Sequence, residues 1–495
     1  MIRRENKLSG FLKGNSGNSI LLALVKLFTT ISGILSTMII SHALSLQLYG
    51  TYSQTALIVT TATNLSALGL VDAINYFYNR SVDVHEQRRY VNTVFGLQCI
   101  FGIVAATLIL LFSSNIVHYF NNTMLQGLFW LMAFRPLFAN LNVSLQYLQV
   151  SIGRAKSVAI RNAGFATLRL IVFAITAFGF QDIRIILIAF LVFEFFITLY
   201  FGYSFVKTKF VLNPILIDWS KIKEIMAYSI PMGVYVMTNS LSRDIDKMLI
   251  GGWCTTDQYA IYTNCAALLP FDIISASFLT ILIPILTRYF GTKEYNKGRI
   301  LFKNYLKIGY YTSFVFTFAC MILSKEMISF LYGNKYLSGR VVFILYVVVD
   351  MVKFANMSIV LSACGRTKTL MICSVGSLAA NYILNIVFYN IFGFYGPAIA
   401  TVVVTVILTI VLAEMSSKAL QTSIVKIIDW SDMLIFILQL VSVGVICMLL
   451  RNILVRISLN SFVILIIIGL LYMGAMFGIN MKKIKRVMKE INTLK

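Results

Sequence analysis

The chain has 495 residues, of which 59% are hydrophobic and only 12% are charged, and its mean hydropathy is +0.83. These values exclude a soluble globular protein of this length, and recurrent apolar runs of about 20 residues predict an all-helical membrane protein that crosses the bilayer many times. The seven cysteines are scattered and the three histidines lack ligand spacing, so the sequence predicts neither a disulfide framework nor a metal site.

The first predicted span follows a basic N-terminal segment that has no small-residue cleavage site, so we predict no cleaved signal peptide. Short polar loops then separate about fourteen apolar segments, each long enough to cross a bilayer as a helix. The predicted spans are residues 20–42, 51–76, 90–113, 124–150, 158–180, 184–206, 225–251, 258–286, 302–323, 340–363, 369–391, 396–416, 433–450 and 458–480.

The basic residues of the loops predict the orientation. Of the 42 lysines and arginines, we assign 28 to cytoplasmic segments, 6 to outer loops and 8 to spans. Because lysine and arginine accumulate on the cytoplasmic side, both termini are predicted to be cytoplasmic. The same distribution explains the net charge of +23 without a nucleic-acid partner, and the basic C-terminal tail is predicted to rest on anionic membrane lipids.

Two short patterns occur twice along the chain. Tyr49–Ser53 matches Tyr259–Thr263 at an offset of 210, and Gly153–Lys156 matches Gly365–Lys368 at an offset of 212. Six predicted spans separate the copies, so the two halves run in the same direction, as in transporters that hold their substrate between parallel repeats. The predicted domains are an N-terminal six-helix lobe (1–206), a cytoplasmic linker (207–224), a C-terminal six-helix lobe (225–420) and two extra helices with a basic tail (421–495).

The seventh span carries four charges, Arg243, Asp244, Asp246 and Lys247, although charged groups are costly in hydrocarbon. Arg243, Asp246 and Lys247 follow helical spacings of three and four, so they share one face and can pair along it. Two interpretations remain open: a self-neutralised structural cluster with Lys247 reaching the interface, or a set of groups that line a water-filled cavity.

Other cations also lie within predicted spans. Arg161 and Lys307 are close to cytoplasmic edges, where a long side chain can reach the headgroups. Lys353 can neutralise Asp350, which precedes it by three residues. With Lys247, the candidate cations of a substrate-binding cavity are Lys26, Arg135, Arg169, Arg243 and Lys353.

Two carboxylates are candidates for coupling to H⁺ or Na⁺. Asp246 belongs to the charged seventh span, and Asp272 lies in mid-span after Pro270, where a kink is expected. A buried carboxylate without a partner can carry a proton, although structural pairing is the simpler interpretation. The sequence indicates no cofactor and no glycine-rich ATP-binding loop.

Several motifs, taken in order, resemble the polysaccharide flippases of the multidrug/oligosaccharidyl-lipid/polysaccharide (MOP) exporter superfamily, in particular Wzx-type flippases of O-antigen or capsule repeat units. The family pattern Asp-[Lys/Arg]-x-x-[Ile/Leu]-Gly corresponds to Asp246–Gly251, with alanine at 260 where glycine is usual in the following motif. The resemblance covers about residues 15–420. Its remaining motifs are Leu48–Tyr52, Ala260–Tyr262, Pro284–Thr287, Tyr332–Tyr336, Asn381 to Asn385 and Gly393–Thr401, the last with Pro397 in place of a small residue.

The resemblance implies a V-shaped pair of six-helix lobes around a cationic central cavity, with Lys26 as the best match by position to the cavity cations of the first lobe. It implies export of an undecaprenyl-pyrophosphate-linked oligosaccharide from the inner to the outer leaflet of the cytoplasmic membrane, by alternating access, for O-antigen or other surface polysaccharide. Membrane lipids, a polysaccharide polymerase and a chain-length regulator are the partners that such a role implies. On this interpretation the protein is not an enzyme.

Three alternatives remain open. A multidrug or cation antiporter of the same superfamily would favour a more acidic and aromatic cavity. A membrane glycosyltransferase or glycan polymerase would need a large outer loop with acidic groups, whereas the longest predicted outer loop, residues 324–339, contains only Glu326. A scaffold without transport activity would not need cations deep in the membrane.

Overall fold

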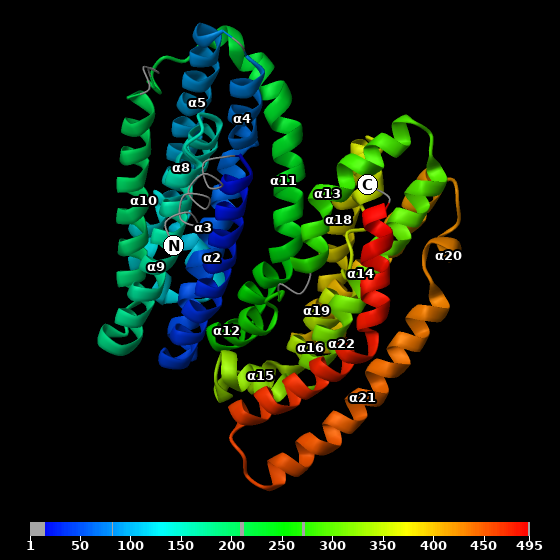
Figure 1. Cartoon of the computed structure of the whole chain (residues 1–495). Helices are drawn as coiled ribbons and strands as arrows, with labels where there is room; N and C mark the ends of the chain where they lie inside the picture. Colours follow the sequence, from blue (N-terminus) through cyan, green and yellow to red (C-terminus); the bar gives the residue numbers. More distant parts are fainter. Residues whose placement is uncertain (1–14, 82, 208–211, 270–272, 494–495) are drawn as a thin grey trace, which may run out of the picture. The chain divides into compact units, whose positions relative to one another are not determined.

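The computed structural model describes residues 15–81, 83–207, 212–269 and 273–493, and every regular element in these ranges is a helix (Figure 1). The predicted all-helical class is therefore confirmed. Eight described helical segments are long and apolar enough to cross a membrane, or ten if two bent helix pairs are each one span. The count of fourteen spans stays a prediction.

Contacts divide the chain into two compact units, which we call unit 1 (Met1–Asp244 and Gly251–Ala260) and unit 2 (Ile245–Ile250 and Ile261–Lys495). Helix α11 (Trp219–Trp253) belongs to both units. Unit 1 also contains α2 (Asn15–Ala43), α3 (Leu46–Ala67), α4 (Leu70–Arg80), α5 (Val84–Leu111), α6 (Ser113–Phe120), η1 (Thr123–Leu128), α7 (Phe129–Ala133), α8 (Arg135–Ser151), α9 (Ala155–Ile175), the π-helical η2 (Thr176–Phe180) and α10 (Ile183–Val206).

Unit 2 repeats this order of elements at an offset near 211. Helices α5, α6 and η1 of unit 1 correspond to α14, α15 and η3 of unit 2. The elements of unit 2 are α13 (Ile273–Gly291), α14 (Tyr295–Ile322), α15 (Ser324–Leu331), η3 (Asn334–Gly339), α16 (Arg340–Val352), α17 (Ile359–Ala363), α18 (Thr367–Phe392), η4 (Gly393–Tyr395), α19 (Gly396–Ala419), α20 (Ile424–Ile427), α21 (Trp430–Arg456) and α22 (Ser461–Thr493), and α12 (Thr256–Cys265) begins in unit 1 and ends in unit 2.

The repeated Gly-Arg pattern forms the same turn in both units. Gly153 has φ +80° and Gly365 has φ +74°, a conformation that glycine adopts without the steric cost of a Cβ. The next amide closes the helix end in each case, because Arg154 N donates to Gln149 O at 2.8 Å and Arg366 N donates to Leu361 O at 2.9 Å. The two copies therefore share a backbone conformation as well as a sequence.

Several predicted spans are divided into more than one helix, and two of them lie in the C-terminal half. The segment predicted as 340–363 breaks between α16 and α17, and the segment predicted as 258–286 contains the end of α12 and most of α13. Side chains satisfy the freed backbone groups at the first break: Asn356 N donates to the Tyr305 hydroxyl at 2.9 Å, and the Ser313 hydroxyl donates to Phe354 O at 3.5 Å. Irregular backbone at membrane depth requires such protein partners.

Helices α21 and α22 pack against α14 and share its core. Phe436, Leu440 and Tyr472 are completely buried there. Polar contacts also join these helices near both ends. At one end, Asp432 of α21 accepts hydrogen bonds from Tyr310 and Tyr311 of α14. The same carboxylate pairs with Lys483 of α22. At the opposite end, Arg451 pairs with the buried Glu326 at 2.7 Å. The two helices beyond the repeat are thus integral parts of unit 2.

Two glycines allow α11 to cross the start of α4 within unit 1. A Cβ on Gly233 would collide with the backbone of Leu68 and Gly69, and Gly69 itself has φ +73°. We expect Gly233→Leu to destabilise this crossing by roughly 1–3 kcal/mol or more, because the backbone cannot yield as a side chain would. Thermal unfolding in detergent measures the loss. Gly202→Leu is the matched control, since nothing lies within 4 Å of its Cβ position, and equal unfolding temperatures for both variants would contradict the prediction.

Candidate functional site: membrane-embedded cations and a buried aspartate

Arg169 of α9 is a half-buried cation with no carboxylate partner in the described part of the chain. Its guanidinium lies over the Phe173 ring at 5.2 Å, and its Nε is buried without a hydrogen-bond partner. Helix α2 packs along α9, where the Ser32 hydroxyl donates to Ala166 O at 2.8 Å and Gly33 lies next to the guanidinium. The small residue on α2 leaves room beside this charge.

Arg161 extends the same face of α9 and was not predicted as a site residue. Arg161, Phe165, Arg169 and Phe173 follow at intervals of four, so both arginines lie on one side of the helix, each over the next aromatic ring. The Nε of Arg161 is also buried without a partner, while its Nη1 donates to Asn162 at 3.0 Å. The four-residue alternation of arginine and phenylalanine is the sequence signal that could have revealed it.

Arg135 is paired instead. Its guanidinium bonds to Glu194 at 3.1 Å and lies over the Phe190 ring at 5.2 Å, and the carboxylate is buried. Asn142 strengthens the contact between α8 and α10 by donating to Glu194 O at 3.0 Å. This pair joins two helices of unit 1, so part of the Arg135 charge is already compensated.

The charged residues of the predicted seventh span lie in different environments. Arg243 is exposed and, within the described residues, forms no ion pair. Asp246, by contrast, is only 1% exposed and accepts hydrogen bonds from Tyr262 (2.8 Å) and from Tyr346. All three residues of this cluster belong to unit 2, whereas Arg243 belongs to unit 1. The bond from Tyr346 could not be foreseen from local spacing, because Tyr346 lies 100 residues from Asp246 in sequence.

We expect Asp246→Leu to destabilise unit 2, because two buried phenol hydroxyls would lose their acceptor at roughly 1–3 kcal/mol each. Asp246→Asn keeps an acceptor oxygen and should retain most of the thermal stability. The two variants also separate structure from ion coupling: if Asp246 only accepts hydrogen bonds, Asp246→Asn transports normally. A stable Asp246→Asn protein that has lost transport would contradict the purely structural role.

The remaining predicted residues have separate positions. Lys26 of α2 is exposed, Lys247 of α11 is half-buried, and Lys353 is exposed at the end of α16. The carboxylate of Asp350 accepts from Leu269 N at 2.9 Å. Asp272 lies outside the described residues. Among the described side chains, no three histidine, cysteine or acidic groups converge as a metal site would require.

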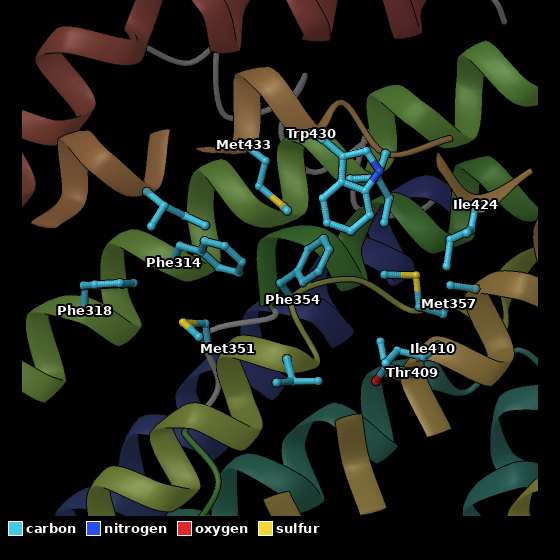
Figure 2. A pocket seen from close by; sticks show the side chains of 14 residues that line it. Phe314, Phe318, Met351, Phe354, Met357, Thr409, Ile410, Ile424, Trp430 and Met433 are labelled. Carbon is cyan, nitrogen blue, oxygen red and sulfur yellow. The ribbon is translucent and has the colours of Figure 1, made fainter. Parts of the chain in front are cut away.

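Unit 2 also contains an apolar cavity of about 310 Å³ (Figure 2). Figure 2 shows Trp430 of α21 and Phe354 pointing toward each other across it. Phe314 and Met351 close one side, from α14 and α16, and Ile410 of α19 forms part of the opposite wall. The cavity has no charged side chain in its lining, in contrast to the face of α9.

Comparisons with known proteins agree on a transporter fold. The structure of "Lipid II flippase MurJ, inward closed conformation" is similar with a TM-score of 0.73 and 16% identity, over 94% of this chain and 99% of that chain. A multidrug resistance MATE family transporter of the MOP superfamily in an outward-facing conformation matches with a TM-score of 0.51 and 15% identity, over 81% and 94%. A second MATE multidrug transporter matches with a TM-score of 0.54 and 14% identity, over 84% and 97%.

At these identities the structural likeness establishes the fold alone. No curated protein matches the sequence significantly. A family model described as polysaccharide biosynthesis protein matches residues 24–340, which is more than half of the chain. This multi-pass membrane protein, whose fold is that of the MOP transporters, therefore belongs to the polysaccharide biosynthesis protein family.

Proposed function

We propose that the protein is a flippase that exports an undecaprenyl-pyrophosphate-linked oligosaccharide repeat unit for O-antigen or another surface polysaccharide. It would act in the cytoplasmic membrane with both termini in the cytoplasm, and move its substrate from the inner to the outer leaflet by alternating access. Membership of the polysaccharide biosynthesis family and the transporter fold support this role. A polymerase and a chain-length regulator would then receive the exported unit.

The observation that carries the proposal is the unpaired guanidinium of Arg169. A charged group within a span is costly unless it pairs or performs a function, and no carboxylate among the described residues compensates this one. A guanidinium can donate two parallel hydrogen bonds to a phosphate, which makes it suited to a pyrophosphate headgroup. Phe173 holds the cation in place without neutralising it.

We propose that three further cations of unit 1 also bind the pyrophosphate headgroup. Arg161 lies on the same face of α9, while Arg243 of α11 and Lys26 of α2 are exposed. Arg135 would act more indirectly, since Glu194 already compensates it. We propose Lys247 and Lys353 as further binding cations, Asp246 and Asp272 as the candidates for H⁺ or Na⁺ coupling, and no cofactor.

The test is the leaflet distribution of the lipid-linked oligosaccharide in a deletion strain. Spheroplasts are treated with a sugar-modifying enzyme that cannot cross the membrane, so that only outer-leaflet substrate is altered. We expect the oligosaccharide to accumulate on the inner leaflet and to be released when the gene is restored. Normal distribution with altered drug susceptibility would favour an antiporter, and single repeat units on the outer leaflet would favour a polymerase.

A further inference from the structure

The same tetrapeptide, Ile-Asp-Trp-Ser, stands at residues 217–220 and 428–431. The offset of 211 is that of the structural repeat. Each copy follows a long helix, α10 or α19, and leads into the next long helix, α11 or α21. We name Leu212–Trp219 the first junction and Ser423–Trp430 the second junction.

The aspartate of each junction is fastened to the corresponding helix of its own unit. Asp218 accepts a hydrogen bond from Arg89 of α5. Asp429 pairs with Lys303 at 3.3 Å and Lys307 at 2.7 Å, both of α14, which corresponds to α5. Hydrogen bonds from Ser220 and then from the Arg89 guanidinium hold the pKa of the Asp218 carboxyl below its usual range. The ammonium groups of Lys307 and Lys303 do the same for the pKa of Asp429. Both aspartates are therefore ionised at neutral pH.

The two junctions differ in what lies beneath them. In unit 1, a Cβ on Gly96 of α5 would collide with the Ile217 side chain and with Pro214 O, so the first junction packs directly on the helix. At the offset of 211, the matching position in unit 2 is the half-buried Lys307, so a long side chain stands where unit 1 has a glycine. The second junction instead covers the 310 Å³ cavity, and supplies Ile424, Ile428 and Trp430 to its wall.

We propose that this cavity binds one acyl chain of an anionic glycerophospholipid from the cytoplasmic leaflet, with the phosphate at the cationic rim. The wall is apolar, and Ile410 is both a lining residue and 55% exposed, which places it at the mouth. A hydrocarbon chain gains contacts in such a cavity that it lacks in fluid bilayer. The cavity is lined by residues of unit 2 alone, and the proposal does not depend on the proposed substrate cations of unit 1.

The basic side chains near the cavity favour a lipid with an anionic headgroup. Lys303 and Lys307 adjoin the cavity through Asp429, which stands between the lining residues Ile428 and Trp430. At the start of the same connection, Gln421 lines a polar pocket of about 540 Å³ with Lys293, Lys297, Arg299 and Glu294. Cations outnumber carboxylates in both places, and this end of unit 2 is the predicted cytoplasmic face, where anionic lipids produce a negative surface potential.

The experiment uses the full-length protein in nanodiscs that contain phosphatidylglycerol with a photoreactive diazirine in one acyl chain. After irradiation, the labelled peptides are identified by mass spectrometry. We expect labels on peptides that contain Ile410 or Trp430, and loss of that label in Ile410→Trp, which closes the mouth. Ile407→Trp is the matched control, because Ile407 is 54% exposed on the same helix and does not line the cavity.

Ala413→Phe fills the cavity from the α19 side and should also lose the label, so the result does not rest on one variant. Unchanged labelling in both variants would overturn the proposal. So would equal labelling by a phosphatidylcholine probe, which would remove the role of the cationic rim, or displacement of the probe by equimolar undecaprenyl phosphate, which would identify an isoprenoid as the occupant. These results need no transport assay, so they are independent of the proposed function.

Discussion

Arg169→Ala is expected to abolish export of surface polysaccharide while the protein still reaches the membrane. The variant removes a cation that has no carboxylate partner among the described residues, so no opposite charge is left exposed by its loss. Loss of hydrogen bonds to a charged ligand costs about 1.5–3 kcal/mol, which weakens binding roughly ten- to hundredfold. Surface glycan and inner-leaflet substrate, measured in the same cells, report the effect.

Arg169→Lys should export at an intermediate level, because an ammonium keeps the charge but cannot form the planar bidentate contact. Arg243→Ala is expected to reduce export for the same reason as Arg169→Ala. Lys156→Ala serves as the matched control, since Lys156 is an exposed cation in the first turn of the same helix α9. Normal surface glycan in both Arg169→Ala and Arg243→Ala would refute the assignment of these cations to the substrate.

Removal of residues 430–495 is expected to prevent unit 2 from folding. In a bilayer, helix association depends on packing and interhelical polar contacts rather than on the hydrophobic effect. Helices α21 and α22 supply both to α14, through Phe436 and Tyr472 in the core and through Asp432 at one end. A fluorescent protein fused after residue 429 reports membrane accumulation, because removal of two spans leaves the fusion on the same predicted side.

The buried pair Glu326–Arg451 provides a sharper version of this test. Glu326→Leu leaves Arg451 without its carboxylate, and loss of one partner of a buried pair costs about 3–5 kcal/mol. The double variant Glu326→Leu with Arg451→Met removes both charges and should recover much of the stability. Normal accumulation of the truncated protein, or a double variant as unstable as the single one, would show that the last two helices do not support unit 2.

The expected family and fold class were available from local patterns. Hydropathy predicted helices throughout, and the motifs between Leu48 and Thr401 indicated the polysaccharide flippases, in agreement with the family match over residues 24–340. The Gly-Arg patterns predicted an internal repeat, and Gly153 and Gly365 adopt the same left-handed conformation. These properties are local, because a turn or a span is encoded by residues that are neighbours in sequence.

The partners of each charged side chain could not be predicted from local sequence patterns. Arg135 and Arg169 both lie deep in predicted spans. Among the described residues, however, Arg135 pairs with Glu194, 59 residues away, whereas Arg169 contacts an aromatic ring four residues away and no carboxylate. Helical spacing grouped Arg243 with Asp246, whereas Tyr262 and Tyr346 bury the aspartate in unit 2. Hydropathy and spacing alone determined that this chain is a helical membrane protein with deep cations. Only the tertiary structure decided which cations are compensated, because the partner of a buried charge comes from another helix whose approach no local pattern encodes.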